Sequence, residues 1–135
     1  MEHSIKVADY EIKFGDPDRA KLEKFASSSQ AQFLAFTNIQ VFLKNIQLGK
    51  IDNYVKIGEK QEQAFNELER MLLEMASDFY NILSNSSAFI NGEMISREKF
   101  DEVFNWDSLD SGNRLQEAVT AFVSELSVTM DEVKN

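Results

Sequence analysis

The chain has 135 residues, a formal net charge of −9 and no cysteine. Its length suits one domain with a sizeable core, and a hydrophobic fraction of 43% with eleven phenylalanines argues against a disordered chain. The lack of cysteine excludes disulfides, thiolate nucleophiles and cysteine-based zinc or iron–sulfur centres.

The charge is unevenly divided along the chain. Residues 1–58 carry a net charge of +1, whereas residues 59–135 carry −10. An acidic half repels nucleic-acid phosphate and anionic lipid, and it favours basic protein surfaces. We therefore expect neither nucleic acid nor a membrane as a partner. Plain solubility is the alternative explanation of the same charge.

Two short alternating patterns open the chain. Ile5 and Val7 alternate with polar residues, and a second alternation follows one residue out of phase, after a slip at Ala8 and Asp9. A period of two predicts a half-buried strand, and an extended arm packed on helices is the alternative. The second alternation consists of Tyr10, Ile12 and Phe14.

The first long helix is predicted over residues 17–48. Asp16 has the side chain of an N-cap, Pro17 suits the first helical position, and Asp18 complements the helix dipole. Gly49 stands where a C-terminal glycine belongs. Apolar residues at steps of three and four form its main face: Leu22, Phe25, Phe36, Ile39, Leu43 and Ile46.

The second long helix begins after a short turn, with Asp52 or Asn53 as its cap, and ends near Ser84. The two helices have similar lengths of roughly 45 Å at 1.5 Å per residue, and a short link makes them antiparallel neighbours. The sequence thus predicts an extended helical hairpin. The apolar stripe of the second helix is Tyr54, Ile57, Phe65, Leu68, Leu72, Met75, Phe79 and Ile82.

The remaining elements are shorter. Asn91-Gly92 between two apolar runs predicts a β-hairpin near 88–95, with an irregular loop as the alternative. Ser96 is the predicted N-cap of a short helix over 97–105, and a last helix covers 113–133.

The fold class is therefore mainly α: a helical bundle built on a long antiparallel helical hairpin plus one short and one C-terminal helix, with a short N-terminal strand and a minor β-hairpin near 88–95. Residues 1–15 form the N-terminal arm or strand, and residues 16–135 form a single helical bundle domain.

Phe25 to Leu43 are nineteen consecutive residues without Asp, Glu, Lys or Arg. Serine, glutamine, asparagine and threonine interrupt this run, so it is too polar to cross a membrane. A helix with so little charge is expected to be enclosed by neighbours. Those neighbours belong either to its own bundle or to another subunit or partner.

A second apolar seam on the first helix is consistent with either alternative. Leu34, Val41 and Leu48 recur at intervals of seven, away from the main face of the first helix, and a helix with two stripes is buried on two sides. The first helix is either central in its own bundle or docks a partner along this seam. The candidate partner-binding residues are Phe33, Leu34, Val41, Phe42, Leu48, Leu73 and Tyr80.

The sequence offers no candidate catalytic, cofactor-binding or metal-binding residue. The one histidine, His3, is expected in a disordered end, so a Ser-His-Asp triad and a histidine-containing di-iron bundle are excluded. Glycine-rich phosphate loops are absent. Paired carboxylates such as Glu67 and Glu74 are expected on solvated helix faces.

These observations favour a non-enzymatic acidic protein-binding module that engages a protein partner through an apolar helical seam. Secretion chaperones, immunity proteins and phage inhibitors share its size and charge only. The expected partner has a basic surface, and the chain itself is expected to form a homo-oligomer, a dimer. A self-assembling structural protein is the alternative, followed by a nucleic-acid mimic and a bundle enzyme. The N-terminus shows no signal peptide, so a cytoplasmic location is expected, with secretion by a signal-less route left open.

Overall fold

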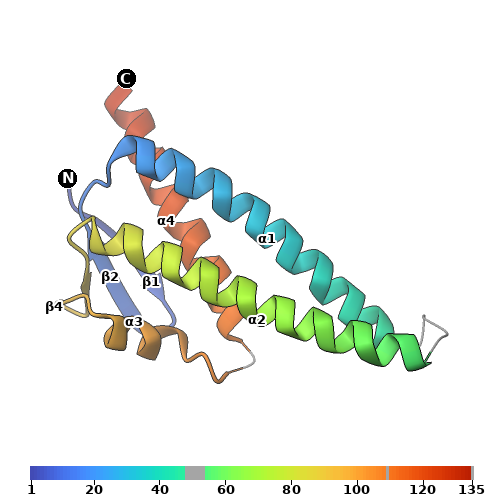
Figure 1. Ribbon diagram of the computed structural model, residues 1–135. Coiled ribbons are helices and arrows are strands. Elements are labelled where there is room, and N and C mark those ends of the chain that lie inside the picture. Colours follow the sequence, from blue (N-terminus) through green and yellow to red (C-terminus); the bar gives the residue numbers. More distant parts are fainter. Residues whose placement is uncertain (48–53, 109, 135) are drawn as a thin grey trace.

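The computed structural model of the chain describes residues 1–47, 54–108 and 110–134. Side chains are described up to residue 45 in the first long helix, from residue 59 in the second long helix and up to residue 127 in the last helix. Over these ranges the predicted mainly-α fold is confirmed (Figure 1). The elements in chain order are β1 (His3–Val7), β2 (Tyr10–Phe14), α1 (Arg19–Gln47), α2 (Tyr54–Ser84), β3 (Phe89–Ile90), β4 (Glu93–Met94), α3 (Arg97–Phe104) and α4 (Ser111–Lys134).

The long hairpin is the dominant feature. α1 and α2 run antiparallel over 29 and 31 residues, and their far end projects beyond the rest of the molecule (Figure 1). Their ends agree with the predicted bounds to within two residues. The ring of Phe25 stacks on that of Phe79 with centroids 5.9 Å apart, and Nε2 of Gln32 donates a hydrogen bond to Asp78. The predicted caps near residues 49–53 lie outside the described residues.

The predicted start of the first helix is corrected by two residues. Asp18, not Asp16, is the N-cap: its Oδ2 accepts a hydrogen bond of 3.1 Å from the backbone N–H of Lys21, which is the third helical residue. Pro17 therefore precedes the helix. The carboxylate of Asp16 is instead engaged by the N-terminal strand, as described below.

The two alternating patterns at the N-terminus are two strands of one β-hairpin. The phase slip is its turn, in which Ala8 has a φ of 53°, so the strand prediction is confirmed over the arm alternative. β1 pairs antiparallel with β2, and β2 pairs in turn with β3, where Ile12 lies opposite Ile90. The sheet order is β1-β2-β3-β4.

The predicted hairpin near 88–95 is also confirmed. Asn91 and Gly92 connect β3 to β4 with φ angles of 49° and 81°, the left-handed pair that a type I′ turn requires. Asn91 also joins this turn to β2, because its Oδ1 accepts from the backbone N–H of Glu11 at 2.9 Å. Ser96 caps α3 as predicted, accepting from the N–H of Lys99.

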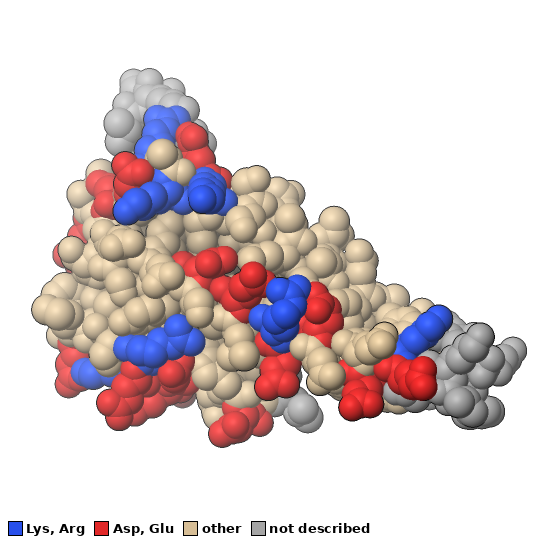
Figure 2. Space-filling model, viewed as in Figure 1, with Lys and Arg blue, Asp and Glu red and all other residues tan. Residues whose placement is uncertain are grey.

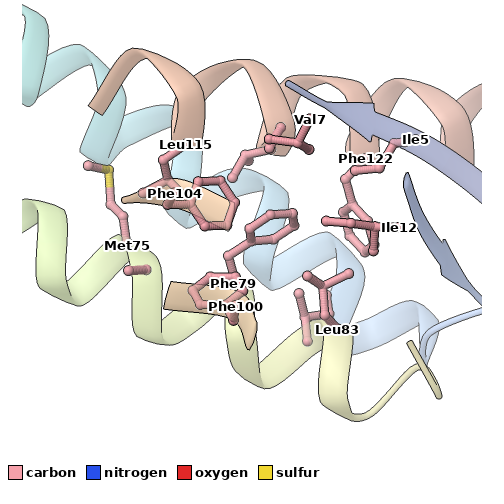
Figure 3. Packing of buried hydrophobic residues seen from close by; sticks show 14 of the residues in the cluster. Ile5, Val7, Ile12, Met75, Phe79, Leu83, Phe100, Phe104, Leu115 and Phe122 are labelled. Carbon is pink, nitrogen blue, oxygen red and sulfur yellow. The ribbon is translucent and has the colours of Figure 1, made fainter. Parts of the chain in front are cut away.

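The core lies where the sheet, α4 and the near half of the hairpin meet (Figure 3). The ring of Phe122 on α4 packs on Phe14 of β2 at 4.7 Å and on Phe79 of α2 at 5.5 Å. The N-terminal hairpin is thus part of the main core, and it buries Ile5, Val7, Ile12 and Phe14.

α4 packs along the near half of the hairpin, and its first turn marks the point beyond which the described part of α4 no longer covers the hairpin. A Cβ at Gly112 would stand 2.9 Å from Cζ of Phe36 and 3.9 Å from Cδ1 of Leu72. Beyond this crossing, Phe65 is 52% exposed although it belongs to the predicted apolar stripe of α2. The absence of a third helix there, among the residues that the structure describes, explains that exposure.

Candidate functional site: an uncharged strip on the outer face of α1

The second apolar seam faces solvent. Leu34 and Val41 are 65% and 51% exposed, so they rank among the most exposed large apolar side chains of the described chain. Each lies two residues before a buried residue of the main face, which at about 100° per residue rotates it roughly 160° away from the core. The two buried residues are Phe36 and Leu43.

The sequence left two explanations of this seam: burial by other helices of the same chain, or docking of a partner. Burial within the same chain is wrong for Leu34 and Val41. The described parts of α2 and α4 pack on the main face of α1 and on its flank, not on its outer face. We name this outer face the α1 strip and define it by five exposed, uncharged residues: Gln30, Leu34, Thr37, Asn38 and Val41.

Alongside the uncharged residues 25–43 of α1, the charges of the hairpin lie on α2. Figure 2 shows α1 largely without charged side chains between its ends, whereas red and blue side chains run along α2. On α2, Arg70 is held between Glu67 and Glu74, with 2.9 Å from Nη1 to the carboxylate of Glu74. The hydrogen bond from Arg70 lowers the pKa of Glu67, and the same bond raises the pKa of Arg70. These paired carboxylates belong to α2 and are not part of the α1 strip.

The other candidate partner-binding residues do not join the strip. Phe33 is half-buried on the flank of α1, where it lines a recess with Val119 and Val123 of α4. Phe42 is half-buried as well, and Leu48 lies outside the described residues.

Leu73 and Tyr80 lie on the side of α2 that is turned away from α1. The ring of Tyr80 packs on Phe100 of α3 at 5.4 Å, and the guanidinium of Arg97 lies 5.5 Å above it. Leu73, seven residues earlier on the same face, is 51% exposed. Asp78 faces α1, and Tyr80 is rotated from it by about 160° around the helix. Leu73 and Tyr80 therefore belong to a surface separate from the α1 strip.

The prediction that His3 lies in a disordered end is wrong. His3 begins β1, is 2% exposed, and stacks on the ring of Phe14. Its Nε2 donates to Oδ1 of Asp16 at 2.5 Å, and its Nδ1 lies 3.9 Å from the carboxylate of Glu125 on α4. One signal was available in the sequence: His3 continues the alternation of Ile5 and Val7, which places it on the buried face of the strand.

Asp16 is expected to contribute a small, pH-dependent stabilisation. The hydrogen bond from His3, followed by that from the N-terminal amine, lowers its pKa below the ordinary value of 3.8. A lowered folded-state pKa stabilises the fold above about pH 4, and this stability is lost as the pH falls through the folded-state pKa. The contribution should stay below about 1 kcal/mol, because the side chain is 58% exposed.

The variant Asp16→Asn tests this expectation. At pH 7 its free energy of unfolding should lie below that of the wild type, and the difference should shrink as the pH approaches 3. Urea unfolding at several pH values measures it. Asp9→Asn, in the exposed turn between β1 and β2, is the control without such a trend. A difference that is the same at pH 7 and pH 3 would contradict the assignment.

A second feature that sequence reasoning missed is an acidic recess beside α3. It has a volume of about 720 Å³ and is lined by Tyr10, Trp106 and several carboxylates. Nε1 of Trp106 donates to Asp101 at 2.8 Å, and Nε of Arg97 donates to the same oxygen at 3.1 Å. Asp101 is thus already paired. Within the described residues, no group of three or more His, Cys, Asp or Glu side chains is placed to hold a metal ion.

No family model, no curated protein and no solved structure matches this chain. Among the described helices, none combines the length and the apolar character that crossing a lipid bilayer requires.

Proposed function

We propose that this protein is a non-enzymatic, cytoplasmic protein-binding module that docks a protein partner along the α1 strip. One observation supports this most: Leu34 and Val41 stay 65% and 51% exposed on a helix face without charge, in a chain whose net charge is −9. Burial of the area that is still exposed would contribute about 0.8–2 kcal/mol for each side chain before the cost of association.

The chemistry of the strip favours an uncharged partner surface. Leu34 and Val41 supply apolar contact, and the amides of Gln30 and Asn38 with the hydroxyl of Thr37 supply donors and acceptors. A basic partner surface, expected from the acidic half of the chain, would instead suit the carboxylates of α2 and α3. An uncharged partner at the strip and a basic partner at the carboxylates are therefore two different proposals. The exposure of Leu34 and Val41 supports the uncharged partner.

Photo-crosslinking from within the strip tests this function. A benzoylphenylalanine at position 37, incorporated in the native host, is expected to give a discrete protein adduct, because Thr37 lies between the two exposed apolar residues. The adduct is identified by mass spectrometry, and it is either a second copy of the chain or another protein.

The matched control places the same crosslinker at Glu74, an exposed position on the charged side of α2. It should give no adduct, or a different one. The variant Leu34→Asp should abolish the adduct from position 37. If position 37 gives no adduct, or an adduct that Leu34→Asp leaves unchanged, the strip does not bind a protein.

A further inference from the structure

We propose that the α1 strip binds the same strip on a second copy of the chain, with two copies of α1 packed antiparallel about a two-fold axis. This inference rests on the proposed function, because it names the occupant of the same surface. It follows from the charge, the spacing and the size of the strip.

Charge selects this face for self-association. Two copies that each carry −9 repel wherever acidic surfaces meet. Contact through the strip avoids this cost, because α1 carries no charge from residue 25 to residue 43. The charges of α2, among them the Glu67–Arg70–Glu74 cluster, belong to the other helix of the hairpin (Figure 2) and are not part of this contact.

The spacing of the strip is self-complementary. A closed dimer uses the same patch on both copies, so residue i contacts residue j and residue j contacts residue i. In an antiparallel pair Leu34 meets Val41 of the second copy, and Val41 meets its Leu34. The two-fold axis then passes between Thr37 and Asn38, whose polar groups face each other across it. An interval of seven residues is that of a coiled-coil seam.

The size of the strip predicts a weak dimer. In the proposed register residues 30–45 face each other and span roughly 22 Å of helix, and with a helix diameter near 11 Å the contact covers about 250 Å² on each copy. A standard stable interface buries about 800 Å² per partner. We therefore expect a dissociation constant in the micromolar range, with monomers at low concentration.

Sedimentation velocity between about 1 and 500 micromolar measures this equilibrium. The wild type should shift from the 15.5 kDa monomer to twice that mass with increasing concentration. Leu34→Asp should weaken dimerisation at least tenfold, because the substitution enters the interface twice. Leu73→Asp is the matched control: it makes the same change at a leucine of similar exposure on the far side of α2, and it should leave the equilibrium unchanged.

The chain contains no cysteine, so a single introduced cysteine reports the geometry. With a short bismaleimide, Thr37→Cys should form cross-linked dimers, because position 37 lies beside the two-fold axis. Gln30→Cys should not, since two such positions are about 22 Å apart along antiparallel helices. A mixture of Gln30→Cys and Asn45→Cys chains should cross-link, because these positions face each other in the proposed register.

The outcomes separate this inference from the proposed function. A protein that stays monomeric at all concentrations, or a dimer that Leu34→Asp leaves intact, overturns the inference. Efficient cross-linking of Gln30→Cys to itself overturns the antiparallel arrangement. A monomer whose position 37 photo-crosslinks to another protein overturns the inference while the proposed function stands. Circular dichroism checks that Leu34→Asp folds, and Val41→Asp serves as the second variant.

Discussion

Replacement of Phe79 by alanine is expected to lower the free energy of unfolding by about 3–5 kcal/mol. Phe79 is 0% exposed and connects four elements of the core. Its ring lies 5.9 Å from that of Phe25 on α1, 6.1 Å from Phe100 on α3 and 5.5 Å from Phe122 on α4. Truncation would leave a cavity that all of these neighbours line, and such a loss is a large part of a typical domain's stability.

Phe65→Ala is the matched control for Phe79→Ala, because it removes the same side chain from the same helix. Phe65 is 52% exposed, so its loss should cost about 1 kcal/mol. Urea unfolding followed by circular dichroism and by the emission of Trp106, the single tryptophan, measures both variants. Equal losses at the two positions would show that the core does not centre on Phe79.

Replacement of Gly112 by valine is expected to lower the free energy of unfolding by about 1–3 kcal/mol through overpacking. The added Cβ would stand 2.9 Å from Cζ and 3.3 Å from Cε1 of Phe36, whose side chain is 5% exposed. Alanine at the same position should cost less, because it adds the Cβ without the two γ-methyl groups of valine. Replacement of a helical glycine by alanine also contributes about 0.5–1 kcal/mol of opposite sign.

A double-mutant cycle makes the test of Gly112 specific. Phe36→Leu removes the ring atoms that the new Cβ would meet, so Gly112→Val should cost less in that background. Asn113→Val, one residue further along and exposed, is the control and should change stability by only a few tenths of a kcal/mol. If valine at position 112 is as costly in the Phe36→Leu background as in the wild type, the close contact with that ring is not the cause.

Local signals in the sequence predicted most of the elements. The periodic stripes of α1 and α2 set their lengths, and the Asn91-Gly92 pair set the turn between β3 and β4. The phase slip at Ala8 and Asp9 marked the turn between β1 and β2, although the pattern was assigned to one strand or an arm. Each of these signals depends on residues that are close in sequence, so each could be predicted from the sequence alone.

The parts that the sequence did not predict depend on long-range contacts. Asp16 has the side chain of an N-cap, but its carboxylate pairs with His3 of β1, and Asp18 caps α1 instead. The pairing of β2 with β3 joins residues that are far apart in sequence. Local propensity carries no information about either.

The candidate site was predicted in part. The seven-residue interval identified Leu34 and Val41 as a second stripe, but a one-dimensional pattern does not show whether a covering surface belongs to the same chain. Leu73 and Tyr80 were grouped with them by the same kind of spacing. The structure separates them because α2 turns that face towards α3.

Because α4 begins beside Phe36 and Leu72, only one half of the hairpin is supported by the rest of the fold. Up to Phe36 and Leu72 the two helices are anchored by α4 and the sheet, and beyond that point they brace one another. The α1 strip crosses this boundary, since Gln30 lies on the anchored side and Val41 on the free side. A partner bound along the strip would contact both parts and so restrict the local opening of the unsupported part. Backbone amides of α1 beyond Phe36 should then exchange with solvent more slowly when the partner is bound.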